Sequence, residues 1–256
     1  MRKLFLLCGI CLSLFSVNLH AQEKKLGYFN SLSIGANVGT TGWGFDIATP
    51  IGQHFALRAG FTIMPNFSYS DEVDVSIDYT SEYIPDGEIP AYIDAEGSMG
   101  RTSGEVLLNI YPFKRSSFFI TGGAVFGGDK LIKIKGHSDE LADYMEQVSN
   151  YNGTLPGIEI GDYVIPVDKN GNISGGLKVS NFRPYFGLGF GRIVPKNKRV
   201  GFLFELGVQL HGTPEVYTDY GSIDNLLEAA DNDFSEIIDK ITVYPVLRFR
   251  LCGKLF

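Results

Sequence analysis

The chain lacks a run of apolar residues long enough to cross a membrane as a helix. Its apolar stretch from Leu4 to Leu14 is far shorter than the roughly 20 residues that a membrane-spanning helix needs. After this stretch no candidate follows. If the protein lies in a membrane, it must cross it as a closed β-barrel, in which every backbone polar group is paired.

Cysteine is also scarce, and its positions exclude a disulfide-stabilised fold. Two of the three cysteines, Cys8 and Cys11, lie within the first 21 residues. If that segment is removed, Cys252 remains alone, without a partner for an intramolecular disulfide. Backbone pairing and side-chain packing must therefore hold the fold together.

The first 21 residues have the features of a secretory signal peptide. Arg2-Lys3 precedes the apolar stretch, and a small residue, Ala21, stands at a suitable cleavage position before Gln22. A lipoprotein would need Cys8 or Cys11 as its acylated residue, which leaves too little apolar core before it. We therefore expect a signal peptide over residues 1–21 and a mature barrel over residues 22–256.

Basic residues are few relative to acidic ones. Without Arg2 and Lys3, 20 basic residues stand against 29 acidic residues, a net charge of −9. A chain this acidic is a poor candidate for binding nucleic acid. Glycine, with 31 residues, and aromatic residues, at 13%, are by contrast abundant for a helical soluble enzyme.

The abundant residues fall into a two-residue alternation, the period of a β-strand with one apolar face. Eight such runs occur, and Phe202, Phe204, Leu206, Val208 and Leu210 form the clearest apolar face. The runs cover approximately 32–39, 43–51, 55–63, 103–110, 118–127, 182–191, 201–211 and 241–252. Their lengths suit tilted membrane-crossing strands, and an even number of antiparallel strands can close. We predict an all-β fold, an eight-stranded antiparallel up-and-down transmembrane barrel.

The connections between the runs divide by length and by charge. Three are long, at 65–98, 128–177 and 212–240, and together they hold 25 of the 29 acidic residues. The short turns on the opposite side carry bases instead: Lys114, Arg115, Lys196, Lys198 and Arg199. Short periplasmic turns and long extracellular loops are typical of outer-membrane barrels, so we assign the three long loops to the extracellular side.

The pattern resembles the small outer-membrane barrels of the OmpA transmembrane-domain and OmpX type. The resemblance rests on the eight runs and on the terminal Phe256. It implies residence in the bacterial outer membrane, insertion by the barrel-assembly machinery, and a lumen packed with side chains and water. Strict alternation places Phe256 inward with Lys254, whereas in such barrels the terminal Phe faces lipid. A bulge at Gly253 would restore that orientation.

The inward faces of the runs collect charge. Seven residues form this lumen charge cluster: Asp46, Arg58, Glu105, Arg183, Glu205, Arg248 and Arg250. Unpaired buried charge is costly, so we expect these groups to be paired. A charge-selective path is the alternative, but an eight-stranded barrel has room for little more than its own side chains. We favour a salt-bridged plug.

The remaining motifs favour structure over chemistry. Gly187, Gly189 and Gly191 share one inward strand face and make room for large neighbours, rather than forming a phosphate loop. The segment 168–172 lacks the Gly and Glu that a calcium loop requires, so Asn170-Gly171 predicts a hairpin turn and no metal site. Alternating residues at 73–79 suggest strands above the membrane, and the amphipathic segment 222–240 suggests a helix after Ser222.

Catalysis finds little support. A lipid-modifying enzyme would need Ser, His and an acid together near the outer leaflet. His211 and Glu205 share a strand face, but the pattern fixes no serine beside them, so we expect no catalytic residue and no cofactor.

We therefore expect a non-enzymatic outer-membrane barrel with a structural or surface-interaction role, in contact with outer-membrane lipids and lipopolysaccharide. A surface partner would bind its acidic loops. The alternatives are a narrow channel for small solutes, a lipid-A-modifying enzyme, and a soluble periplasmic ligand-binding barrel.

Overall fold

The computed structural model describes residues 26–76, 92–114, 116–148, 157–160, 163–196, 198–220, 224–225 and 240–256. The predicted signal peptide lies outside this range, as do Ile77, Tyr79 and nearly all of the predicted helix at 222–240. Within that segment Asp224 and Asn225 form a short strand, so the helix prediction is wrong at these two residues. No helix in the described part of the chain is long and apolar enough to cross a membrane.

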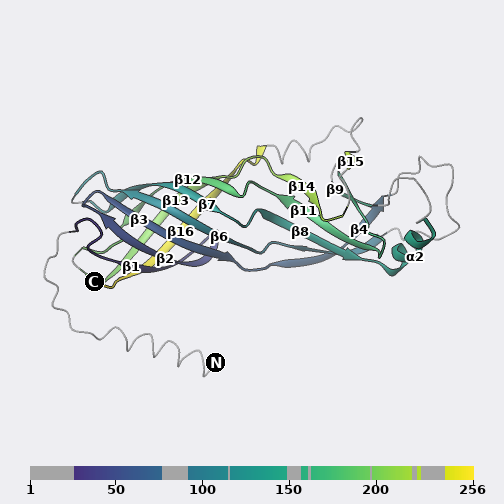
Figure 1. The fold of residues 1–256 in the computed structure, drawn as a ribbon, viewed down its shortest axis with the longest axis horizontal. Coiled ribbons are helices and arrows are strands. Elements are labelled where there is room, and N and C mark those ends of the chain that lie inside the picture. Colours follow the sequence, from purple (N-terminus) through teal and green to yellow (C-terminus); the bar gives the residue numbers. More distant parts are fainter. Residues whose placement is uncertain are drawn as a thin grey trace, which may run out of the picture.

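Eight of the described strands close into an antiparallel barrel, which confirms the predicted fold class (Figure 1). Neighbours along the chain pair with each other, and β16 closes the ring by pairing with β1 from Ser33↔Lys254 to Gly39↔Arg248. The strands are β1 (Ser33–Gly39), β2 (Gly42–Ile51), β3 (Phe55–Met64), β6 (Arg101–Ile110), β7 (Phe118–Phe126), β12 (Phe182–Gly191), β13 (Val200–Leu210) and β16 (Val243–Lys254).

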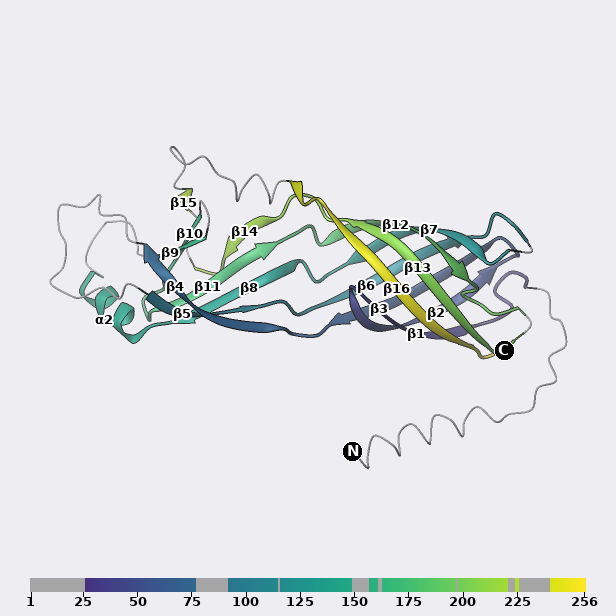
Figure 2. The same ribbon diagram turned by 180° about the vertical axis from the view of Figure 1, so that it is seen from behind.

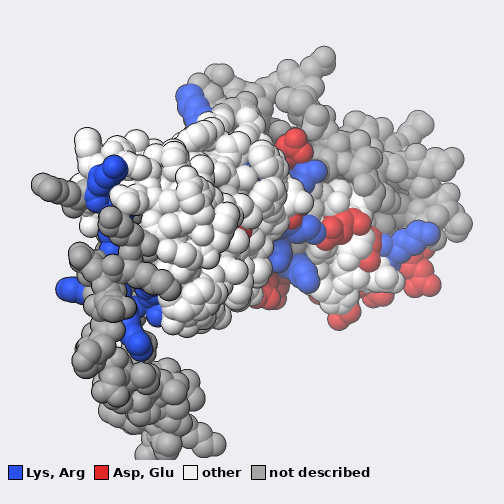
Figure 3. All heavy atoms as spheres, turned by 60° about the vertical axis from the view of Figure 1, so that its left-hand side comes forward, with Lys and Arg blue, Asp and Glu red and all other residues white. Residues whose placement is uncertain are grey.

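The predicted alternation separates the two faces of the barrel wall. In β13, Phe202 and Leu206 lie on the outside, 60% and 47% exposed, while Glu205 between them is fully buried. Large apolar side chains cover the outer face of the other strands as well. In Figure 3 this face is a belt without charged residues. Charged side chains of the barrel therefore lie in the lumen and at the two ends of the barrel.

The last strand differs in one detail from the expected register. β16 pairs with β1 and β13 without any shift through Gly253, so the bulge that would have restored the orientation of Phe256 is absent. Lys254 ends the strand, and the Leu255 amide donates a hydrogen bond to the Leu32 carbonyl. Phe256 follows beyond this last bond with its side chain exposed. It is thus free of the alternation that would have turned it inward.

The segments predicted as long loops form a second structure beyond one end of the barrel, which we call the extension (Figures 1 and 2). Eight strands make its sheet, in the order β14-β11-β8-β5-β4-β9-β10-β15. They are β4 (Ser68–Ser76), β5 (Tyr92–Ser98), β8 (Lys130–His137), β9 (Gly157–Ile160), β10 (Tyr163–Pro166), β11 (Asn172–Lys178), β14 (Glu215–Thr218) and β15 (Asp224–Asn225). The β4 strand confirms the expectation of strands at Val73 and Val75.

An apolar cluster on one face holds the extension together. Ile93 of β5 and Ile173 of β11 pack with Val167 and with Leu141 of helix α2 (Asp139–Val148). The Ser138 hydroxyl caps this helix by accepting the Leu141 amide hydrogen at 3.2 Å. Because side chains alternate along a strand, the opposite face of the same sheet carries polar residues.

The predicted hairpin turn at Asn170-Gly171 is present. Gly171 adopts a φ of 71°, and Val167 and Ile173 bridge across the turn. One Asp168 carboxylate oxygen accepts the amide hydrogens of Asn170 and Asn172 at 2.8 and 2.7 Å. The second oxygen accepts a hydrogen bond from the Asn172 side chain, so the hydrogen bonds of this carboxylate stabilise the turn.

Replacing Leu141 by alanine should destabilise the extension and leave the barrel folded. Leu141 is fully buried, so truncation should cost about 2–5 kcal/mol of local stability. Limited proteolysis should then cleave the extension faster, while the barrel fragment keeps its heat-modifiable migration on a gel. The exposed neighbour Asp143→Ala is the matched control. Equal cleavage rates in the two variants would contradict the assigned core.

Candidate functional site: the barrel lumen and its outer mouth

The three acidic residues of the lumen charge cluster each bind an arginine. Asp46 accepts hydrogen bonds from Arg250, with Nε at 2.8 Å from Oδ2. Glu105 accepts two parallel bonds from Arg248, at 3.0 and 2.6 Å. All of these side chains are buried. The geometry of the second pair is the bidentate form, the strongest arrangement of this ion pair.

Glu205 joins two of the pairs into one network. Its carboxylate oxygens lie 3.0 and 2.9 Å from Nη2 of Arg58, and Tyr185 donates its hydroxyl hydrogen to Oε1 at 2.5 Å. Arg248 approaches the same oxygen at 3.6 Å. Arg58 on β3 and Glu205 on β13 stand on opposite sides of the ring of eight strands, as do Glu105 and Arg248. These pairs therefore tie the wall together across the lumen.

The fourth arginine is held differently. Arg183 has no ion pair among the described residues, and its guanidinium donates to backbone carbonyls of Gly127, Gly128 and Ser180. It also donates to the Ser103 hydroxyl at 2.9 Å. The structure thus pairs six members of the cluster, two of the pairs joined through Glu205 and the Asp46–Arg250 pair separate, and places Arg183 apart, near the end of the barrel that carries the extension.

Glycines make room for these large groups. A Cβ atom on Gly35 would overlap the Arg250 guanidinium, and one on Gly207 would overlap the Tyr185 hydroxyl. At Gly189 it would come within 2.6 Å of the Phe119 ring. The sequence-based reading of inward glycines as space for neighbours therefore agrees with the structure. Tyr185 itself was missed, although the alternation places it on the same inward face.

A turn that sequence reasoning did not single out closes the other end of the barrel. Between β12 and β13, Ile193, Val194 and Pro195 are buried. The Ile193 amide donates to the Tyr111 hydroxyl at 2.9 Å, and its carbonyl accepts from Ser33 and Arg250 at 2.8 and 2.9 Å. The sequence feature that could have predicted this buried turn is three consecutive apolar residues within a turn that is otherwise basic.

The apolar floor below the ion pairs extends around this turn. Leu26, Ala48, Ala56, Tyr111, Phe119, Ile193, Val194 and Leu203 form one buried cluster. Arg192 lies over the Tyr111 ring, 4.1 Å from its centroid, and donates to the Ser116 carbonyl at 2.6 Å. The lumen is therefore filled by ion pairs in its middle and by packed apolar side chains at this end.

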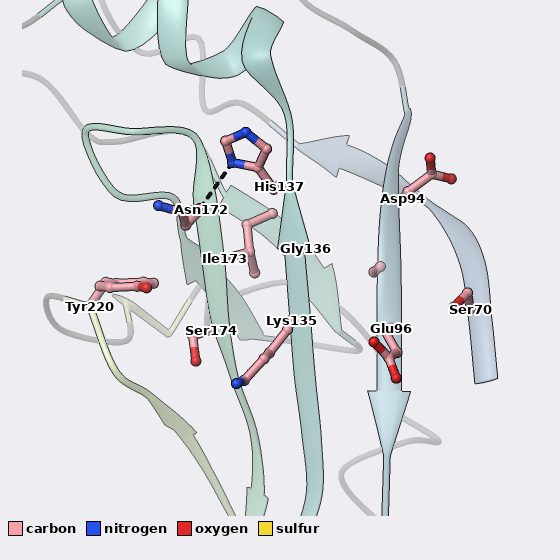
Figure 4. Close-up of a pocket in the computed structure, with 11 residues that line it drawn as sticks. Ser70, Asp94, Glu96, Lys135, Gly136, His137, Asn172, Ile173, Ser174 and Tyr220 are labelled. Carbon is pink, nitrogen blue, oxygen red and sulfur yellow. Dashed lines mark hydrogen bonds between the residues drawn. The ribbon is translucent and has the colours of Figure 1, made fainter. Parts of the chain in front are cut away.

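The extension bears two cavities on the polar face of its sheet. The lower cavity, about 570 Å³, joins the top of β3 and β6 to the extension and is lined by Met64, Asn66, Glu96, Ser98, Gly100, Arg101, Thr102, Lys133 and Lys135. The upper cavity, about 540 Å³, lies between β4, β5, β8, β11 and the segment after β14 (Figure 4). Both volumes lie in the range of small-ligand sites, roughly 300–1,000 Å³.

The upper cavity combines charged, amide, hydroxyl and aromatic groups. Asp94, Glu96, Lys135, His137, Asn172, Ser174 and Tyr220 are among the residues that line it. His137 is bound to the Asn172 side-chain oxygen at 2.9 Å, the contact drawn in Figure 4. Among the described residues no group of His, Cys, Asp or Glu is arranged to hold a metal ion.

The two residues considered for catalysis are not joined. Glu205 is engaged by Arg58 and Tyr185, deep in the lumen. His211 is buried near the extension, where its backbone amide donates to the Thr242 carbonyl and its carbonyl accepts from the Ser180 amide. Their place on one strand face therefore does not bring these two side chains together as an acid–histidine pair.

Comparison with known proteins gives a limited match. No family model and no curated protein matches the chain. The chain is similar to the crystal structure of CarO from Acinetobacter baumannii, with 19% identity and a TM-score of 0.47 over 86% of this chain and 96% of that one. CarO2 from the same organism matches with the same identity and TM-score, over 88% and 98%.

Replacing Glu205 by glutamine should destabilise the barrel strongly. The change leaves Arg58 buried without its carboxylate, a loss of about 3–5 kcal/mol. Urea unfolding of the protein in lipid vesicles would measure it. Adding Arg58→Met should recover part of the loss, because the unpaired charge is then gone. The exposed pair Lys178–Glu215, 3.4 Å apart, provides the control Glu215→Gln, for which we expect less than about 1 kcal/mol. Similar losses for both glutamines would contradict the network.

Acid should loosen the contact between β11 and the segment after β14. The Ser174 hydroxyl bond, together with Lys130, lowers the pKa of Asp219 below its ordinary 3.8 despite partial burial. The carboxylate therefore stabilises this contact above that value and loses its effect as pH falls through the lowered pKa. Amide chemical shifts of Ser174 and Asp219 should move together in this acid range. Asp219→Asn should abolish the movement; if it persists, another group is responsible.

Proposed function

We propose that the protein is an integral barrel of the bacterial outer membrane, non-enzymatic, that presents the extension outside the cell for structural support or surface interaction. Support comes first from the outer wall. Side chains such as Phe186, Phe190 and Phe202 are each more than half exposed. An apolar belt of this extent is unfavourable in water and favourable against lipid.

The polarity of the two ends supports the orientation. Lys114, Lys196, Lys198 and Arg199 lie at the end opposite the extension, beside the buried turn. In Figure 3 blue residues gather at that end, and acidic residues appear on the extension side. Short basic turns would then face the periplasm, as in the OmpA- and OmpX-type barrels that the sequence resembles.

The filled lumen is the observation that carries the functional conclusion. Three ion pairs occupy its middle, and Ile193 and Val194 pack into its periplasmic end. Solute passage would require breaking buried pairs and withdrawing a hydrogen-bonded turn. Any activity therefore belongs to the extension and its cavities, rather than to transport through the wall.

The partners follow from this placement. Outer-membrane lipids would contact the apolar belt, and lipopolysaccharide would surround the base of the extension. The barrel-assembly machinery would insert the chain after removal of the signal peptide at 1–21. A surface partner would meet the exposed polar face of the extension sheet.

Two measurements test this proposal together. The outer-membrane fraction should contain a species whose gel migration changes on boiling, and purified protein in planar bilayers should show no single-channel steps. Exchanging Ile193 and Val194 for glycine should leave the bilayer silent, because the buried ion pairs still fill the middle of the lumen. A species that stays in the soluble fraction would contradict the membrane placement. Steps from the unaltered protein would contradict the sealed lumen and favour the narrow channel.

A further inference from the structure

The two cavities of the extension form one continuous polar surface. Glu96 and Lys135 line both of them. These two residues are register partners on β5 and β8, but their charged groups form no ion pair. Figure 4 shows the Lys135 side chain running toward Ser174 and away from Glu96. A ligand longer than one cavity could therefore contact both.

The lower cavity is basic within an acidic surface. The three loop segments 65–98, 128–177 and 212–240 contain only five basic residues, and two of them, Lys133 and Lys135, line this cavity. Arg101 adds a third positive charge, against Glu96 alone. Arg101 also lies over the Tyr244 ring, 4.9 Å from its centroid. This concentration of cations suits a carboxylate or phosphate group.

The upper cavity suits neutral hydroxyl groups. The Asp94 and Glu96 carboxylates form no hydrogen bond or ion pair with other described residues, so their acceptor oxygens are available. A second negative group would be repelled there, which confines the charge of a ligand to its lower end. The Tyr220 backbone is fixed by Thr218, whose hydroxyl accepts the Tyr220 amide hydrogen at 3.1 Å. The aromatic ring lies at the cavity edge (Figure 4).

We propose that the two cavities bind an acidic saccharide, with its phosphate or carboxylate against Lys133, Lys135 and Arg101. Its hydroxyls donate to Asp94 and Glu96, and one sugar ring packs on Tyr220. This assignment rests on the proposed function, because it names the ligand class of the surface-exposed extension. The same chemistry is found in phosphorylated core sugars of lipopolysaccharide and in uronic-acid polysaccharides from outside the cell.

Isothermal titration calorimetry with the full mature chain in detergent tests the proposal. The probes are deacylated, phosphorylated core oligosaccharide of lipopolysaccharide, oligogalacturonate, and a neutral maltooligosaccharide. We expect binding of one or both acidic probes, weakened by salt, and at least about tenfold weaker binding of the neutral one. Binding of the core sugar alone identifies the membrane's own lipid as the source. Binding of oligogalacturonate alone identifies an external polysaccharide.

Variants separate the two ends of the site. Lys133→Gln and Lys135→Gln should each weaken the acidic probes by about tenfold, the effect of one charge-assisted hydrogen bond. Tyr220→Ala should weaken saccharides while leaving their salt dependence intact. Lys178→Gln, on β11 but outside both cavities and paired with Glu215, is the matched control. Heat-modifiable migration of each variant confirms that it is folded.

Three results would overturn the site: no binding of either acidic probe, equal binding of the neutral probe, or the same effect from Lys178→Gln as from Lys133→Gln. Different results would contradict the proposed function. Channel steps or a soluble protein would contradict the sealed membrane barrel, whereas the saccharide titrations report on the extension alone.

Discussion

The pairing of β16 with β1 is the constraint on which the rest of the structure depends. It removes the two free edges of the sheet, so that every barrel strand has two hydrogen-bonded neighbours. Once the ring is closed, alternate side chains must point either into a narrow lumen or out of the wall. The large apolar residues take the outside, and the charged ones are left with each other. The internal ion pairs are thus a consequence of closure.

Closure also sets the size of what fits inside. Some of the large side chains in the lumen lie beside glycine, as Arg250 does beside Gly35 and Tyr185 beside Gly207. Glycines on the inward face of the wall therefore leave the space that large inward side chains fill. Buried ion pairs add little net stability over apolar packing, but losing one partner is costly. A strand arrangement that left one of these charges unpaired would therefore be less stable than the one observed.

The amino-acid sequence predicted the barrel strands well because each strand carries its own signal, as the faces of β13 illustrate. It predicted which charges lie inward but not their partners. Arg58 and Glu205 are 147 positions apart, and their contact depends on the stagger of strands around the whole ring. Strands of the extension were expected only at 73–79 and beside the turn at Asn170-Gly171, and β8 was missed, although Ile132 and Ile134 alternate with Lys133 and Lys135. In a short, highly charged strand such alternation is a weak predictor. The strand is stabilised by pairing with its neighbours in the sheet, which its own sequence does not reveal.

The junction between barrel and extension explains why a polar surface lies over this mouth of the barrel. Along the chain from β5 to β6, Ser98 and Arg101 both line the lower cavity, although strict alternation over three positions would oppose them. Met99 and Gly100 interrupt the strand between them, and the Met99 amide donates to the Phe67 carbonyl. The interruption changes the parity of the faces, so that the inward side of β6 continues onto the polar side of β5. The apolar side of the extension is then left for α2 to cover. A local irregularity of two residues thus decides that the cationic cavity opens at the mouth of the barrel.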